Sequence, residues 1–307
     1  MSADADRLIE VDWNTFDPWR IQAVRHRLMD HPLLQTPSLV ELSKRLESRG
    51  RVRTHSSDAT PGTPFNTAPK LHPNPMTAAS TLQQIEQAKA WMSLLNVQTD
   101  DTYRSLVDEV LDDVKPGVDR LDPGMCYRGG WIFITSPRAV TPFHMDLEHN
   151  FILQILGKKR LYVWDPFDRG VVSERARELF LSYQSRDLVR FYEDFRSRSQ
   201  VFELEPGMGG YMPSTAPHLV ENGDGPSVTM SFTYYTASTR KRSLLYRGNT
   251  HLRRLGFDPP PVGNDPTRDA TLARAMQVYS GAKELALRAL GKEVLPPTAP
   301  YAAHVTS

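Results

Sequence analysis

The stretch Thr141–Trp164, TPFHMDLEHNFILQILGKKRLYVW, decides how this chain is interpreted. His144 and Asp146 stand two positions apart, just before two apolar runs that are separated by a tight turn at Gly157. In an extended segment, residues i and i+2 point to the same side, so this imidazole and this carboxylate can converge on one point. The stretch therefore predicts a pair of metal ligands followed by a β-hairpin.

A third ligand has to come from elsewhere in the chain. The later segment GYMPSTAPHLVENGDGPSVTMSFTYY offers His218, on the approach to another β-rich run. Two imidazoles and one carboxylate on one face of a metal form the facial triad typical of non-haem Fe(II) oxygenases. A His-x-Asp pair also arises by chance, and most isolated histidines are surface or core residues. The strands around the pair and the proline-rich approach to His218 favour the metal site.

Side-chain alternation assigns faces to the two apolar runs. Asn150, Ile152 and Gln154 fall on one side of the first strand, with Phe151, Leu153 and Ile155 on the other. A barrel interior that holds a polar ligand would take the mixed set, and a covering layer would take the apolar set. After Gly157 the same alternation lets Lys159 share a cavity with Asn150. The alternative for the basic run Lys158–Arg160 is a solvated turn.

Length, charge and cysteine content limit the class of protein. A chain of 307 residues can form one large domain, or a core domain with a helical appendage. Because 37 Lys and Arg balance 36 Asp and Glu, there is no general electrostatic case for a nucleic-acid or membrane partner. The single cysteine, Cys126, excludes an internal disulfide. With no signal peptide or membrane-spanning apolar run in view, we expect a soluble, cytoplasmic protein.

The segments before the core stretch are expected to be mostly helical. We expect helices over 21–29, over 38–50 with Ser38 as the cap, over 81–92, and over 102–114 with Pro116 ending the last one. Residues 54–76 contain many prolines and predict an irregular loop. That loop is either a wall of the substrate site or a loose surface segment.

The segments after the core stretch alternate between helix and strand. Residues 165–200 predict a charged helical insertion with Leu179, Phe180, Leu188 and Phe191 toward the core. Residues 202–206 and 227–235 predict strands, and the turn at 222–225 predicts a hairpin. The basic segment 240–254 is expected to be solvated surface. Residues 267–291 predict one helix with a broad apolar stripe that needs a surface to cover.

These residues resemble the cupin-like JmjC group of Fe(II)/2-oxoglutarate oxygenases, and within it the asparaginyl hydroxylases. The likeness is dense over Thr141–Trp164, resumes around His218 and is thin elsewhere. Its residues, in matching order and spacing, are Thr141, Pro142, His144, Asp146, Asn150, Phe151, Gln154, Gly157, Lys159 and Arg160. The resemblance implies a mainly β fold with flanking helices, built on a double-stranded β-helix (cupin or jelly-roll) core.

The resemblance also assigns roles to individual residues. His144, Asp146 and His218 would bind Fe(II), which the cosubstrate 2-oxoglutarate would chelate through its ketoacid end. Burying the other carboxylate of 2-oxoglutarate unpaired would be costly. The family places there a lysine and a threonine that match Lys159 and Thr141.

Further matches lie near the ketoacid end. Asn150 matches a residue beside it, and Ser231 stands where the family has a second asparagine. Thr233 replaces a tryptophan, so the pocket should be roomier on that side. The position of a tyrosine that contacts the cosubstrate aligns only loosely with Ser93.

The implied activity is an Fe(II)/2-oxoglutarate-dependent dioxygenase that hydroxylates a protein or peptide side chain and releases succinate and CO2. Attack on an N-methyl group would give demethylation instead. Two alternatives stay open: a hydroxylase of a small metabolite, and a non-catalytic cupin-like protein that binds a ligand or partner. The intact triad together with Lys159 and Thr141 favours the enzyme.

Three regions are expected along the chain. Residues 1–120 would form a helical and loop region packed on the core, 121–240 the cupin-like JmjC core with the insertion 165–200, and 241–307 a helical C-terminal region. Because related hydroxylases dimerise through C-terminal helices, the resemblance implies a homodimer through the last helix.

Overall fold

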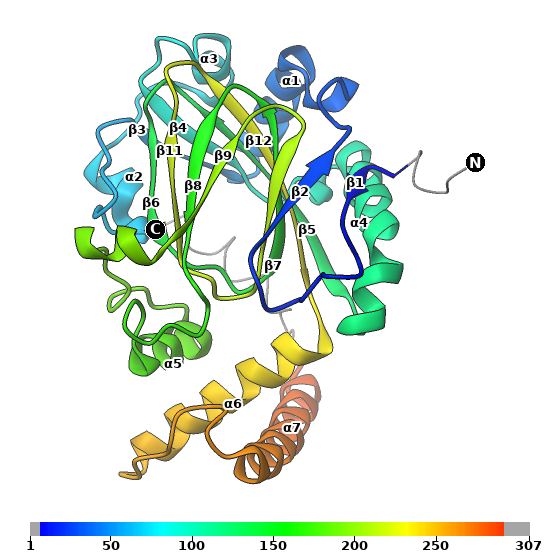
Figure 1. Cartoon of the computed structure of the whole chain (residues 1–307), viewed down its shortest axis with the longest axis vertical. Coiled ribbons are helices and arrows are strands. Elements are labelled where there is room, and N and C mark those ends of the chain that lie inside the picture. Colours follow the sequence, from blue (N-terminus) through cyan, green and yellow to red (C-terminus); the bar gives the residue numbers. More distant parts are fainter. Residues whose placement is uncertain (1–6, 292–307) are drawn as a thin grey trace.

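Two antiparallel sheets face each other in the computed structural model, which describes residues 7–291 (Figure 1). The larger sheet has the order β1 (Ile9–Glu10), β2 (Gln22–His26), β10 (Met208–Met212), β7 (His149–Leu156), β12 (Ser227–Tyr235), β5 (Cys126–Thr135), β4 (Ala90–Leu94) and β3 (Val52–Ser56). The smaller sheet has the order β6 (Val140–His144), β11 (His218–Asn222), β8 (Lys159–Val163) and β9 (Gln200–Leu204).

From β5 to β12 the chain winds repeatedly between the two sheets. The strands β5, β7, β10 and β12 lie in the larger sheet, and β6, β8, β9 and β11 lie in the smaller one. This path is that of a double-stranded β-helix, and helices flank it (Figure 1). The predicted fold class, mainly β with a jelly-roll core and flanking helices, is confirmed.

Neither of the two predicted hairpins forms. β7 pairs with β10 and β12, whereas β8 pairs with β9 and β11, so the turn at Gly157 carries the chain from one sheet to the other. The turn after Asn222 likewise joins β11 of the smaller sheet to β12 of the larger sheet. A turn signal fixes where the chain reverses. Burial of both strands inside a two-sheet sandwich decides which strands pair.

The faces predicted from alternation are found in the larger sheet. Phe151 and Leu153 of β7 belong to an apolar cluster that also contains Leu106 and Val110 of helix α4 (Asp101–Leu121). Helices α1 (Thr36–Glu47) and α3 (Ala78–Gln83) contribute to the same cluster. Ile152, on the opposite face of β7, packs in a second cluster between the sheets. The outer face is therefore covered by helices, and the inner face is left for the site.

Several predictions for the first third of the chain are wrong. Residues 22–26 form strand β2 instead of a helix, because they pair with β1 on one side and β10 on the other. Helix α3 ends at Gln83, and residues 90–94 form strand β4. Helix α1 begins at Thr36, with Gln35 in the cap position, so Ser38 does not cap it.

Helix α4 does not end at Pro116. It continues through this proline to Leu121. Val114 and Val118, on either side of Pro116, are both buried against the core and hold the two parts of the helix in line.

Short elements fill the connections. The loop after β3 holds η2 (Phe65–Thr67) and α2 (Ala68–Leu71), and η1 (Pro32–Leu34) and η3 (Val97–Thr99) precede α1 and α4. The insertion 165–200 carries α5 (Glu174–Tyr183) and η4 (Glu193–Arg198). Phe180 is buried there as predicted, whereas Leu188 is exposed. The boundaries expected between the three regions of the chain, at 120/121 and 240/241, stay a prediction.

Two helices complete the described chain. α6 (Ala237–Arg254) and α7 (Pro266–Ala289) lie together at the lower end of Figure 1, beyond the sheets. Of the predicted stripe on α7, Met276 is buried, but Val278, Leu285 and Leu290 are exposed. The rest of the predicted C-terminal region, 292–307, lies outside the described residues.

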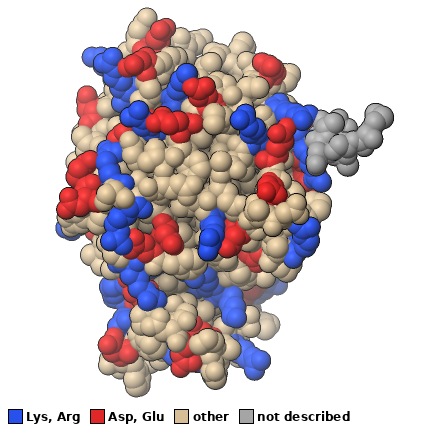
Figure 2. All heavy atoms as spheres, viewed as in Figure 1, with Lys and Arg blue, Asp and Glu red and all other residues tan. Residues whose placement is uncertain are grey.

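Acidic and basic side chains are interspersed on the surface. Figure 2 shows both signs scattered around the face that it presents, with no field of a single sign. Within the described residues, none of the helices is long and apolar enough to cross a membrane.

Candidate metal centre and adjoining pocket

Three side chains converge where β6 and β11 meet. His144 ends β6 and His218 begins β11, and these residues face each other in the antiparallel pairing. Asp146 follows in the loop after β6, and its Oδ2 lies 3.6 Å from His144 Nε2 and 3.7 Å from His218 Nε2. The ligand atoms of the three residues all lie within 4.8 Å of one another. The strand pairing thus supplies the third residue that the sequence could only propose.

Hydrogen bonds fix which nitrogen each histidine offers. His144 Nδ1 lies 2.8 Å from the Pro142 carbonyl oxygen, and His218 Nδ1 lies 3.0 Å from that of Ala216. Because a carbonyl only accepts, each Nδ1 carries the hydrogen and each Nε2 keeps its lone pair toward the shared point. Burial lowers the pKa of both histidines, so both imidazoles are neutral near pH 7 and able to bind a metal.

Asp146 is held in its ionised form. Burial alone would raise the pKa of this carboxyl, but His144, His218 and Arg186 outweigh burial and keep the pKa below its ordinary value. Arg186 Nη2 donates to Asp146 Oδ1 over 3.1 Å and to the Met145 carbonyl over 2.9 Å. Because Arg186 takes Oδ1, the other oxygen, Oδ2, is the one that faces the histidines. The donor set therefore fits a divalent metal of the Fe(II) kind.

Arg186 also ties the metal centre to the loop after β3. Its Nη1 donates to Asn66 Oδ1 over 3.1 Å, and its guanidinium lies over the Phe65 ring. Phe65 stacks on His144 with ring centroids 3.8 Å apart and planes 6° apart. The loop 54–76 was expected to be either a wall of the site or a loose surface segment. Phe65 of this loop lies in the wall of the site.

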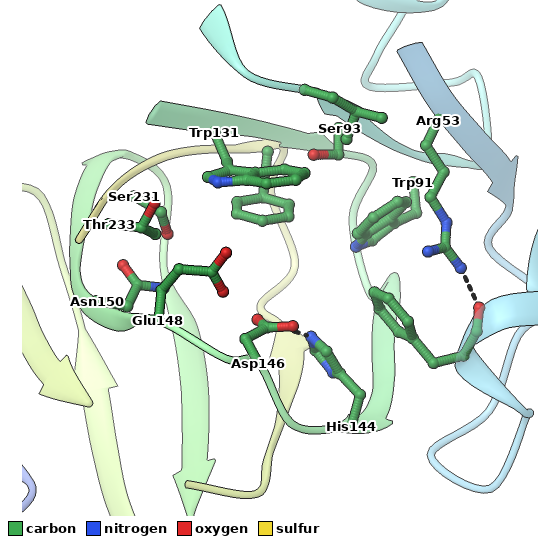
Figure 3. Close-up of a pocket in the computed structure, with 13 residues that line it drawn as sticks. Arg53, Trp91, Ser93, Trp131, His144, Asp146, Glu148, Asn150, Ser231 and Thr233 are labelled. Atoms are coloured by element: carbon green, nitrogen blue, oxygen red, sulfur yellow. Dashed lines mark hydrogen bonds and ion pairs between the residues drawn. The ribbon is translucent and has the colours of Figure 1, made fainter. Parts of the chain in front are cut away.

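A pocket opens beside the three converging side chains, with walls from β3, β4, β5, β7 and β12 (Figure 3). Its aromatic members are Phe65, Trp91, Trp131 and Phe133. Its polar and charged members are Arg53, Ser93, His144, Asp146, Glu148, Asn150, Ser231 and Thr233, and Leu95 completes it. The pocket is thus an apolar cleft with a few polar groups, as ligand sites usually are.

Three hydroxyl and amide oxygen atoms of this pocket are buried without a hydrogen-bond partner. They are Ser93 Oγ, Asn150 Oδ1 and Ser231 Oγ. Unpaired buried polar atoms are costly and uncommon in folded proteins. A polar ligand in the pocket would satisfy them.

The predicted partners of the far carboxylate lie on the smaller sheet. Thr141 Oγ1 accepts a hydrogen bond of 2.8 Å from Trp91 Nε1, which leaves the hydroxyl hydrogen of Thr141 free to be donated. Lys159 is 5% exposed and lies on the same face of β8 as Leu161 and Val163, which pack between the sheets. Burial lowers the pKa of Lys159 to about 7.

Lys159 faces the interior without a counter-ion. Across residues 7–291, it takes part in no hydrogen bond or ion pair through its side chain. Lys158 and Arg160 lie at the surface, where they form ion pairs with Glu205 and Glu203. The alternative of a solvated turn therefore holds for these two residues and not for Lys159.

The structure thus gathers most of the predicted site residues. His144, Asp146, Asn150 and Ser231 line the pocket, and so do Ser93 and Thr233. His149, next to the ligand loop, is separate from the three ligands and hydrogen-bonds Tyr211 and Ser214 instead.

Sequence reasoning missed other residues of the metal centre and the pocket. Trp91 falls where a helix was predicted, and Arg186 gives no local signal because its contact is 40 residues away in the chain. Glu148 could have been found, since it stands two positions after Asp146. Burial, together with the charge of Asp146, raises the pKa of Glu148 to about 7.

Comparison with known proteins agrees with this architecture. The family described as Cupin-like domain matches residues 11–240, well over half of the chain. A search of curated proteins gives no match.

Solved structures of YcfD, a ribosomal oxygenase from Escherichia coli, are among those that match. One is 16% identical, covers 62% of this chain and 48% of that chain, and has a TM-score of 0.36. The complex of YcfD with cobalt and 2-oxoglutarate is 16% identical, covers 62% and 46%, and has a TM-score of 0.34. This chain thus spans less than half the length of those proteins. Sequence identities and TM-scores this low do not assign any property of YcfD to this chain. From the domain match and the strand path, the chain belongs to the family of cupin-like domain proteins.

Proposed function

We propose that this protein is an Fe(II)- and 2-oxoglutarate-dependent oxygenase that hydroxylates a protein or peptide side chain. The reaction would consume one O2 and one 2-oxoglutarate, place one oxygen atom in the product C–OH, and release succinate and CO2. The observation that carries the proposal is the convergence of His144, Asp146 and His218 at the edge of a pocket. A set of two histidines and one carboxylate leaves coordination positions open for the cosubstrate and oxygen.

Lys159 supports 2-oxoglutarate as the cosubstrate. A buried ammonium without a counter-ion is costly, and a carboxylate of the cosubstrate would neutralise it. The free hydroxyl hydrogen of Thr141 and the unpartnered hydroxyl of Ser231 would donate to other oxygens of the same molecule.

The chain itself would position and shield the reactants. The backbone carbonyls of Pro142 and Ala216 orient the two imidazoles, and Arg186 orients the carboxylate. The aromatic walls would help to exclude water once the pocket is filled. Bound Fe(II) would supply the oxygen chemistry that no side chain can perform.

The proposal can be tested before any substrate is known. Purified protein is reconstituted without oxygen, Fe(II) and then 2-oxoglutarate are added, and the visible difference spectrum is recorded. We expect a metal-to-ligand charge-transfer band that requires both additions and is lost in His144→Ala, Asp146→Ala and His218→Ala. His149→Ala is the matched control and should keep the band, because this histidine contacts Tyr211 and Ser214.

Bound Fe(II) without a band would contradict the oxygenase and favour a cupin-like binding protein. Loss of the band in His149→Ala alone would show that the wrong histidine had been assigned to the metal.

A further inference from the structure

Helix α6 carries a local excess of positive charge that the balanced total of the chain conceals. Its 18 residues, ASTRKRSLLYRGNTHLRR, contain no aspartate or glutamate. The helix lies beyond the sheets, with α7 beside it (Figure 1). Its six arginines and lysines are Arg240, Lys241, Arg242, Arg247, Arg253 and Arg254.

Two of these six side chains have partners in neighbouring elements. The guanidinium of Arg242 lies 4.9 Å from the ring centroid of Trp19 and 4.7 Å from that of Phe167. Arg253 Nε lies 2.9 Å from Glu178 Oε2, in helix α5. These two charges are therefore part of the contact between α6 and the rest of the molecule.

The other four side chains, those of Arg240, Lys241, Arg247 and Arg254, are exposed. Within residues 7–291, none of these four forms an ion pair. The three arginines follow one another at intervals of seven residues. Because seven residues are about two helical turns, they form one row about 21 Å long on a single face of α6. We call these three residues the arginine row.

The arginine row suits phosphate groups that repeat along a chain. A guanidinium can donate two parallel hydrogen bonds to one phosphate, and a nucleic acid presents phosphates of a single sign at regular intervals. A membrane surface is a poorer fit. Leu245 and Tyr246 of α6 are buried in an apolar cluster with Phe180, so they cannot form the apolar face that a membrane-bound helix needs.

Two exposed aromatic rings stand at the C-terminal end of the arginine row. Tyr183 is 45% exposed, and the Arg254 guanidinium lies 5.0 Å from its ring centroid. Phe257 is 63% exposed and follows the end of α6. Exposed rings next to cationic side chains are typical of surfaces on which unpaired bases stack. They favour a nucleic acid over an acidic protein.

We infer that the arginine row of α6 binds the phosphate backbone of a single-stranded nucleic acid, without reading its sequence. Each arginine contacts one phosphate, and Tyr183 and Phe257 offer stacking surfaces for the bases. The inference goes beyond the proposed function and does not depend on it, because α6 contributes no residue to the pocket or the metal centre.

Salt dependence tests the inference directly. Fluorescein-labelled RNA and DNA single strands of about 20 nucleotides are titrated with the full chain between about 50 and 200 mM KCl, and fluorescence anisotropy is recorded. Three phosphate contacts predict a slope of log K against log salt of about −2. We expect the triple change Arg240→Ala, Arg247→Ala, Arg254→Ala to weaken binding at low salt at least about tenfold and to bring the slope near zero.

Two further variants separate the arginine row from folding and from net charge. Replacing the same three arginines with lysine keeps the charges and should keep the slope. The matched control removes an equal charge from three exposed arginines that pair with acids elsewhere on the surface, and it should bind as the wild type does. Its changes are Arg138→Ala, Arg160→Ala and Arg198→Ala.

Four results would overturn the inference. They are no anisotropy change with wild-type protein up to about 100 µM, unchanged binding by the α6 alanine variant, an equal loss in the matched control, and displacement of the strand by polyglutamate as readily as by unlabelled RNA. The last result would point to an acidic protein partner. Absence of the Fe(II)/2-oxoglutarate band would refute the oxygenase and leave this inference standing.

Discussion

Lys159 shows how one buried side chain can report on a ligand. Replacing it with alanine removes the only positive charge proposed for the far carboxylate of 2-oxoglutarate. We expect Lys159→Ala to weaken 2-oxoglutarate binding by about 10- to 100-fold, the cost of losing one charge-assisted hydrogen bond, and to leave metal affinity nearly unchanged. Titration of the charge-transfer band with 2-oxoglutarate and then with Fe(II) separates the two effects. An unchanged cosubstrate titration would remove Lys159 from the site.

The same residue predicts a dependence on pH. Burial lowers the pKa of Lys159 to about 7, so the ammonium of the ligand-free protein is lost as the pH rises through that value. Affinity for 2-oxoglutarate should therefore fall above about pH 7, and Lys159→Arg, which stays charged, should flatten the dependence. Between about pH 7 and 10.5, Lys159 is protonated in the unfolded chain and neutral in the folded, ligand-free protein. The free energy of unfolding should therefore rise with pH over that range.

At the scale of elements, the link between β7 and β8 is tightly constrained at Gly157. Gly157 has φ of 76°, and a Cβ there would lie 2.1 Å from the Pro226 carbonyl oxygen. Gly157→Ala should therefore lower the free energy of unfolding by at least about 2 kcal/mol, since it adds a left-handed backbone penalty to a backbone clash. Urea denaturation measures the change.

Gly281 provides the matched control. It lies exposed inside helix α7, and a Cβ there would meet nothing within 4 Å. Gly281→Ala should leave stability unchanged or raise it by up to about 1 kcal/mol, because alanine is the better helix former. Equal changes in the free energy of unfolding for Gly157→Ala and Gly281→Ala would contradict the backbone clash expected at the turn between β7 and β8.

At the scale of the whole molecule, α7 leaves apolar side chains in solvent. Val278 and Leu285, two helical turns apart on one face, are 73% and 72% exposed. The homodimer through this helix stays a prediction. We expect light scattering to give the mass of a dimer, and the double change Val278→Glu, Leu285→Glu to give a monomer. Lys283→Glu, on the same helix, is the control and should leave the dimer intact. A monomeric wild type would contradict the predicted homodimer.

The sequence by itself determined the residues that have a local signature. The spacing of His144 and Asp146, the alternation of Asn150 with Phe151, and the likeness over Thr141–Trp164 and around His218 led to the cupin-like core and to the three candidate metal ligands. Period-2 alternation and metal-ligand spacing depend only on neighbours in the chain, so one sequence is enough to find them.

The tertiary structure alone decided which distant segments meet. It turned part of the expected helix at 21–29 into strand β2, placed the strands around Gly157 in different sheets, and set His218 opposite His144. It also brought Arg186 to Asp146 from an insertion without a motif. Strand pairing and buried charge pairing are contacts between remote residues, and their energy depends on what the rest of the fold buries, so no local pattern in the chain encodes them.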